Sequence, residues 1–147
     1  MADPAYLLDA GVVIRWFIHQ GGWQHACEVR QQFFAGTVAL ETVDSVRVEA
    51  AHVLRVKGLE PGRLSRQEYL DAVRACDDAG VIVHVSDVGA LERAAALAAD
   101  RSLRIFDALV VDRAIERNLT LLTTDRRLVH AVADMLPTEL LRGLDGR

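Results

Sequence analysis

The 147-residue chain is poor in cysteine, proline and aromatic residues, and Lys57 is the single lysine among 17 basic residues. Its two cysteines, Cys27 and Cys76, lack metal-site spacing and argue against a disulfide-stabilised scaffold, which favours a reduced cytosol. No apolar run approaches the ~20 residues of a membrane span, and the N-terminal residues lack the positive start and apolar core of a signal peptide. We therefore expect a cytoplasmic protein without a membrane partner.

The charge balance leaves the class of partner open. A net charge of −4 is unusual for a protein that binds nucleic acid, but it is only a total, and bound cations would remove part of it locally. Arginine suits phosphate binding because the guanidinium group donates two parallel hydrogen bonds. The codon bias of a GC-rich genome gives the same preference for arginine, so composition alone decides nothing.

The hydropathy pattern predicts one α/β domain over residues 1–147, with a mostly parallel sheet covered by helices on both faces. Apolar, β-branched runs predict strands, and longer runs with helical periodicity and capping residues predict helices. The chain shows no internal repeat, linker or low-complexity segment. Strands are expected at residues 5–8, 37–40, 81–85, 119–123 and 140–141, and helices at 11–18, 23–35, 44–57, 65–79, 87–99, 107–117 and 126–135.

Four acidic residues stand at corresponding places in this pattern. Asp9 and Asp125 directly follow predicted strands, and Glu49 and Asp107 lie on or at the start of helices. Ligands of open α/β sheets bind beyond the carboxyl ends of the strands. Carboxylates gathered there without basic partners would repel one another, and a hard divalent cation such as Mg²⁺ or Mn²⁺ relieves that repulsion. The sequence therefore predicts a metal site.

Each acidic residue also has a simpler interpretation. Asp9, Asp107 and Asp125 would all serve as helix N-caps. Glu49 shares one helical stripe with Val46 and Val53, and could lie at the edge of that stripe in solvent or pair with an arginine. Asp112 follows Asp107 by five residues, about 500° of helical rotation, so we expect it to be peripheral or solvent-facing.

Four segments carry a resemblance to a known family. In chain order they are YLLDAGVVIRWF (residues 6–17), VEAAHVL (48–54), FDAL (106–109) and LTTDRRL (122–128). Together they resemble the motifs of PIN-domain nucleases, particularly VapC-type toxins of toxin–antitoxin pairs. The resemblance covers nearly the whole chain, in the right order and at the right separations.

The resemblance implies a divalent-metal-dependent endoribonuclease that leaves a 3′-hydroxyl and a 5′-phosphate. It places Asp9, Glu49, Asp107 and Asp125 as the catalytic, metal-binding residues, with one or two Mg²⁺ or Mn²⁺ ions, and Thr123 as a hydrogen-bonding support. It further implies a homodimer, RNA as the substrate and an antitoxin protein as a possible partner.

Two departures from the family pattern leave an alternative open. Gly11 stands where the family often has serine or another small polar residue, and His52 where asparagine is common. A degenerate PIN domain that acts as a non-catalytic binding or dimerisation module would accommodate both.

Other features of the sequence bear on the remaining alternatives. A phosphoryl-accepting receiver domain would need a lysine after its last strand, whereas Lys57 lies mid-chain. Arg15, Arg126 and Arg127 lie near the motifs and could contact phosphates or serve only as polar surface.

Overall fold

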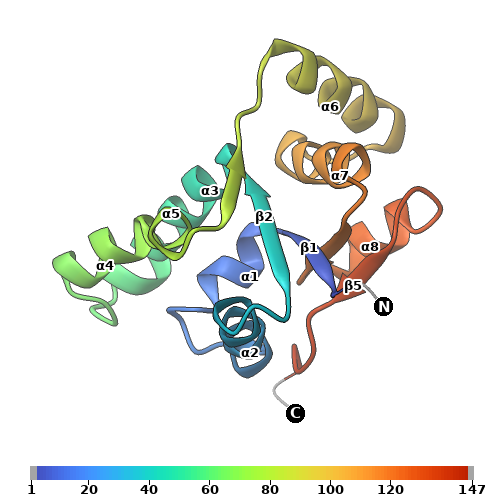
Figure 1. Cartoon of the computed structure of the whole chain (residues 1–147). Helices are drawn as coiled ribbons and strands as arrows, with labels where there is room; N and C mark the ends of the chain where they lie inside the picture. The colour runs from blue at the N-terminus through green and yellow to red at the C-terminus, as the bar shows by residue number, and fades with distance from the viewer. Residues whose placement is uncertain (1–2, 146–147) are drawn as a thin grey trace.

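The computed structural model describes residues 3–145, and its centre is a five-stranded parallel sheet (Figure 1). The strands lie in the order β3-β2-β1-β4-β5, and every neighbouring pair is parallel. The predicted α/β class and parallel sheet are confirmed. The strand bounds are β1 Ala5–Leu8, β2 Ala39–Val43, β3 Ile82–His84, β4 Thr120–Thr123 and β5 Thr138–Leu140.

Eight α-helices and one π-helical turn surround the sheet within the described residues. Figure 1 shows α1–α5 on one side of the sheet and α6–α8 on the other, as predicted for a sheet covered on both faces. The helix bounds are α1 Ala10–Ile14, α2 Trp23–Phe34, α3 Asp44–Leu54, η1 Arg55–Leu59, α4 Arg66–Val73, α5 Ala75–Ala79, α6 Val88–Arg101, α7 Ile105–Arg117 and α8 Arg126–Val132. No helix of residues 3–145 is long and apolar enough to cross a membrane.

The strand order reverses direction between β1 and β4. From β1 the chain moves outward through β2 to β3 on one side, then crosses to β4 and β5 on the other side. Parallel connections are right-handed, so the two halves place their helices on opposite faces. The carboxyl ends of β1 and β4 therefore diverge into different helices, and such a switch point is where open α/β sheets bind ligands.

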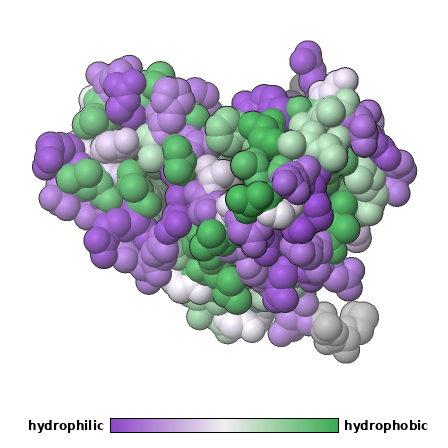
Figure 2. Space-filling view, turned by 90° about the horizontal axis from the view of Figure 1, so that it is seen from above, coloured by the Kyte–Doolittle hydropathy of each residue, from purple (hydrophilic) through white to green (hydrophobic). Residues whose placement is uncertain are grey.

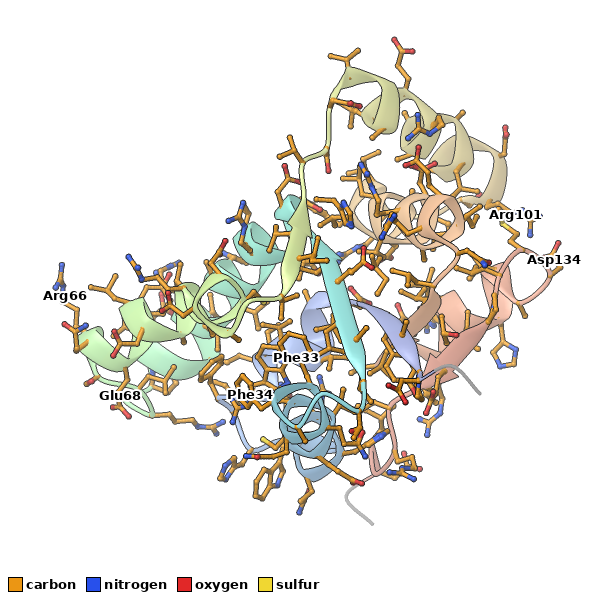
Figure 3. All side chains as sticks on the ribbon, viewed as in Figure 1. Phe33, Phe34, Arg66, Glu68, Arg101 and Asp134 are labelled. Carbon is orange, nitrogen blue, oxygen red and sulfur yellow. The ribbon has the colours of Figure 1, made fainter. Side chains whose placement is uncertain are left out.

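The core lies on both faces of the two central strands. Leu7 and Leu8 of β1 and Leu121 and Leu122 of β4 are fully buried, as parallel strands covered on both faces require. Beyond the sheet, Arg101 at the end of α6 donates two hydrogen bonds to Asp134, 2.8 and 3.0 Å long, which connect α6 to the turn after α8 (Figure 3).

The second strand lies farther along the chain than predicted. It runs over Ala39–Val43 rather than 37–40, and includes two polar residues, Glu41 and Thr42, that are buried with partners. The Thr42 hydroxyl donates to the Leu8 carbonyl at 2.9 Å, and Glu41 accepts hydrogen bonds from Arg117. Buried polar groups with partners are compatible with a strand, and local hydropathy could not predict those partners.

Two predicted helices are interrupted. The helix expected to run to Lys57 ends at Leu54 and continues as a π-turn, in which the Glu60 amide donates to the Arg55 carbonyl. Gly58 packs so tightly that a Cβ there would lie 2.6 Å from Leu64 Cδ1. The helix expected at 65–79 divides at Arg74 into α4 and α5.

Several predicted helix caps are confirmed. Ser65 and Glu68 form the predicted capping box at the start of α4, and Asp87 caps α6. Asp9 and Asp125 cap α1 and α8. Asp107 does not open its helix, because α7 begins two residues earlier at Ile105.

Candidate metal and nuclease site

A pocket of about 280 Å³ lies at the switch point between β1 and β4. Its lining residues come from the segment directly after β1, from α1, α3 and η1, from the start of α7 and from the segment after β4. All four predicted carboxylates line it: Asp9, Glu49, Asp107 and Asp125. These residues are distant in sequence, so the fold gathers them, as the positions of their motifs predicted.

Asp9 is the most buried of the four carboxylates, with 8% of the residue exposed. One oxygen, Oδ1, accepts from the Ala10 amide at 2.7 Å, and the other, Oδ2, accepts from the Thr123 hydroxyl at 2.7 Å. A carboxylate offers about four lone-pair sites, so two contacts leave acceptor capacity on Asp9. The N-cap role and a ligand role are therefore compatible at this residue.

Thr123 connects the ends of the two central strands. Its hydroxyl donates to Asp9 and accepts from the Asp125 amide at 3.1 Å. Asp125 in turn accepts from the amides of Arg127 and Leu128 through Oδ1 alone. Within residues 3–145, Asp125 Oδ2 has no hydrogen-bond partner, which leaves it available at the pocket.

Glu49 and Asp107 share a basic partner that the sequence did not reveal. Arg104 Nη2 donates to Glu49 Oε1 at 2.9 Å, and Arg104 Nε lies 3.5 Å from Asp107 Oδ2. Arg104 is the N-cap residue of α7 and its guanidinium also lies 5.6 Å from the Phe106 ring centre. The interpretation of Glu49 as the partner of an arginine therefore holds, in addition to its place in the pocket.

Burial and mutual repulsion make the pocket unfavourable for ionised carboxylates. Burial raises the pKa of Asp107 to about 6, with a further contribution from the charge of Asp9 and an opposing one from Arg104. Burial also raises the pKa of Asp9, and the charges of Glu49 and Asp125 add to this, while the hydrogen bonds from Thr123 and Ala10 oppose it. Such shifts are typical of sites that gather like charges for a ligand or a reaction.

The structure explains why position 11 of this chain is glycine. A Cβ on Gly11 would lie 2.2 Å from Thr124 Oγ1, so the Thr124 side chain fills the space that another residue at 11 would need. The pocket therefore keeps a hydroxyl group beside Gly11, since Thr124 is one of its lining residues. His52, the other departure from the family pattern, is exposed on α3 and does not line the pocket.

The arginines named from the sequence do not reach the carboxylates. Arg15 lines the pocket, but its guanidinium donates to the carbonyls of Gly21 and Gly11 and fixes the loop after α1. Arg126 pairs with Asp145 at 3.3 Å.

Asp112 is peripheral to the pocket but not solvent-facing. It pairs with Arg93 at 3.2 Å and its side chain is only 15% exposed.

Sequence reasoning missed Arg104 and Lys57, which both line the pocket. For Arg104, its place three residues before Asp107 is the only local indication.

The donor set suits a hard divalent ion. Carboxylate and hydroxyl oxygens are the ligands that Mg²⁺ and Mn²⁺ prefer. In the present arrangement, however, no three acidic, histidine or cysteine side chains of residues 3–145 are placed to hold one ion together. The guanidinium of Arg104 contacts one oxygen of each of two carboxylates, so an ion that binds Glu49 and Asp107 competes with it.

Comparison with known proteins identifies the family. The sequence model of the PIN domain matches residues 6–134, most of the chain, so this chain belongs to the PIN domain family. Among curated proteins, no sequence matches it.

Solved structures share the fold at low sequence identity. VapC20 of Mycobacterium tuberculosis, described as a sarcin-ricin loop cleaving toxin, has a TM-score of 0.68 at 13% identity, and the match covers 86% of this chain and 94% of that one. PAE2754 of Pyrobaculum aerophilum has a TM-score of 0.60 at 22% identity, and the match covers 89% of this chain and 87% of that one. VapBC2 of Rickettsia felis was solved with a DNA fragment from its promoter. It has a TM-score of 0.61 at 13% identity, and the match covers 92% of this chain and 98% of that one. The chain is thus similar in fold to toxins of the VapBC type.

Proposed function

We propose that this protein is a divalent-metal-dependent endoribonuclease, the toxin of a toxin–antitoxin pair. The observation that carries the proposal is the meeting of Asp9, Glu49, Asp107 and Asp125 in one pocket at the switch point of a PIN-domain sheet. Four independent helix caps or surface acids would have no reason to converge there. The similarity in fold to a sarcin-ricin loop cleaving toxin supports RNA as the substrate.

In this proposal the four carboxylates hold Mg²⁺ or Mn²⁺. A bound ion supplies an activated water and neutralises charge on the phosphodiester as the bond breaks. Asp9 is fixed by Thr123 and Ala10, so its orientation does not depend on the ligand. Asp125 is fixed through Oδ1 by the first turn of α8, and it lines the pocket. No side chain has to act as a nucleophile.

We propose an antitoxin protein as a partner because several similar structures are toxin–antitoxin complexes. The homodimer implied by the resemblance and the cytoplasmic location expected from the sequence remain part of the proposal. Phe34 on α2 and Val48 on α3 are 58% and 68% exposed, and Figure 3 shows Phe34 beside Phe33 on α2. In Figure 2 the apolar residues on the visible face form several patches among hydrophilic ones. Light scattering that finds only monomer at tens of micromolar would contradict the dimer.

Cleavage of a structured RNA in Mn²⁺ tests the proposed reaction. Asp9→Asn, Glu49→Gln, Asp107→Asn and Asp125→Asn should each lower the rate by about a hundredfold or more, because they remove charge that positions the ion. A double substitution should cost little more than the worst single one, since the residues act as a unit. Melting curves of all variants show whether the fold survives.

Asp112→Asn is the matched control, an acidic residue on the same helix as Asp107 that lies outside the pocket. It should cleave RNA at nearly the wild-type rate. Full activity in Asp125→Asn, or an equal loss in Asp112→Asn and Asp107→Asn, would mean that the site is assigned wrongly. Folded wild-type protein that cleaves no RNA with Mn²⁺ or Mg²⁺ would favour the non-catalytic binding module.

A further inference from the structure

Arg104 is the basic residue that directly contacts the acidic pocket's carboxylates. Among residues 3–145, no other lysine or arginine forms an ion pair with Asp9, Glu49, Asp107 or Asp125. Its guanidinium bridges Glu49 on α3 and Asp107 on α7, at 2.9 and 3.5 Å. The shorter contact joins Glu49 and Arg104, which are 55 positions apart in the sequence, so the bridge forms only in the folded chain.

The bridge takes one oxygen of each carboxylate, Glu49 Oε1 and Asp107 Oδ2, and places a positive charge where an ion would bind. A guanidinium and a divalent cation both take carboxylate lone pairs, and the two positive charges repel one another at this range. With this bridge in place, four carboxylates line one pocket, yet no three acidic, histidine or cysteine side chains of residues 3–145 are placed to hold one ion. An ion at Glu49 and Asp107 therefore competes with Arg104, and the repulsion between the two charges favours departure of the guanidinium.

Arg104 is built to move without disturbing the fold. Its side chain is 60% exposed, and its backbone lies in the short connection between α6 and α7. Glu49 and Asp107 are more enclosed, with side chains 24% and 15% exposed, so the arginine and not the carboxylates has room to turn outward. A freed guanidinium at the mouth of the pocket is well suited to a phosphate group, which it can bind through two parallel hydrogen bonds.

We propose that Arg104 is a displaceable latch. It covers Glu49 and Asp107 when no ion is bound, and it turns to a phosphate of the RNA strand once a divalent ion occupies those carboxylates. This inference rests on the proposed nuclease function, and it adds a positioning residue that links ion binding to substrate binding.

Calorimetric titration with Mn²⁺ tests the first half of the proposal. Arg104→Ala should bind Mn²⁺ about tenfold more tightly than the wild type, because the ion no longer displaces a competing cation. A gain in affinity is informative, since a variant that only damaged the structure would bind less tightly. Arg104→Lys, which keeps the charge but cannot bridge both carboxylates, should lie between the two.

Arg93→Ala is the matched control for this titration. Arg93 also bridges two acidic residues on α7, Asp112 and Glu116, but lines no part of the pocket. Its replacement should leave the Mn²⁺ affinity at the wild-type value. Wild-type affinity in a folded Arg104→Ala protein, or an equal gain in Arg93→Ala, overturns the latch.

Steady-state cleavage at saturating Mn²⁺ tests the second half. Arg104→Ala should raise the KM for RNA about tenfold and change kcat much less, because it removes a phosphate contact and not an ion ligand. Tighter Mn²⁺ binding with an unchanged KM overturns the phosphate contact alone. If the wild type binds no Mn²⁺ at millimolar concentration, the metal site of the proposed function fails and the latch fails with it, whereas a wild type that binds Mn²⁺ isolates the test of Arg104.

Discussion

The Thr123 hydroxyl donates a 2.7 Å hydrogen bond to Asp9 Oδ2, although 114 residues separate the two in sequence. Both side chains are buried, and the same hydroxyl accepts from the Asp125 amide. One small side chain thus fixes the ends of β1 and β4 relative to one another, at the point where the strand order reverses. The orientation of two candidate ion ligands depends on it.

Replacing Thr123 tests this link. Thr123→Val should lower the free energy of unfolding by about 1–3 kcal/mol, because the buried Asp9 oxygen loses its donor. It should also weaken Mn²⁺ binding by about tenfold, since partners of ion ligands tune affinity. Urea denaturation and calorimetric titration measure the two effects.

Thr42→Val is the control for that variant. Thr42 is equally buried and donates to the Leu8 carbonyl at 2.9 Å, but it does not line the pocket. It should lose similar stability while its Mn²⁺ affinity stays at the wild-type value. Equal affinity in both variants would show that Thr123 is an ordinary core contact.

The close contact between Gly11 and Thr124 predicts that substitutions at these two positions have coupled effects on stability. Gly11→Ala should destabilise the fold by about 1–3 kcal/mol, because its Cβ would meet Thr124 Oγ1 at 2.2 Å. In a Thr124→Ala background, which removes that oxygen, the same substitution should cost much less. A double-mutant cycle from urea denaturation measures the coupling, and additive effects would contradict the clash.

The raised pKa of Asp107 predicts a pH-dependent loss of stability in protein without bound metal. Its pKa is about 6 in the fold against an ordinary 3.8, so the folded chain binds more protons between these values. Asp107 therefore lowers stability as pH rises from 3.8 to about 6, and the loss is complete above that range.

Asp107→Asn removes the ionised carboxylate that causes this loss of stability. In chelator-treated protein above pH 6 it should raise the free energy of unfolding, on the order of 1–3 kcal/mol, and the gain should shrink toward pH 4. Thermal melts across this pH range, with Asp112→Asn as the control, measure it. A variant that is less stable than the wild type at every pH would show that ionised Asp107 does not destabilise the fold.

A second buried carboxylate should behave in the opposite way. Burial acts to raise the pKa of Glu41, but hydrogen bonds from Arg117 and His84 outweigh it and hold the pKa below the ordinary 4.5. Its stabilisation is therefore present above pH 4.5 and is lost as pH falls through the lower folded value.

Glu41→Gln should accordingly cost about 1–3 kcal/mol near neutral pH and much less in acid. Glu116→Gln, which removes a half-exposed partner of Arg93 on the surface, should cost less than about 1 kcal/mol. Urea denaturation at both pH values compares them. Equal costs for Glu41→Gln at neutral and acid pH would contradict a charge-dependent role.

The sequence alone determined the α/β class, the parallel sheet and the helix caps at Asp9, Ser65, Asp87 and Asp125. These features follow from periodicity and from capping chemistry within a few residues, which are local properties. The candidate site was also predictable as a set of four positions, because acidic residues at the ends of strands and starts of helices converge in a parallel sheet. Their roles as ion ligands stay a prediction.

Only the tertiary structure decided which partners those residues have. Glu41 and Thr42 lie inside a strand because Arg117 and Leu8 satisfy them, and nothing near them in sequence indicates this. The contact between Arg104 and Glu49 likewise requires α3 and α7 to meet. Burial, repulsion and hydrogen bonding between distant segments depend on the packed fold, so the local pattern could name the acidic residues but not the arginine that covers two of them.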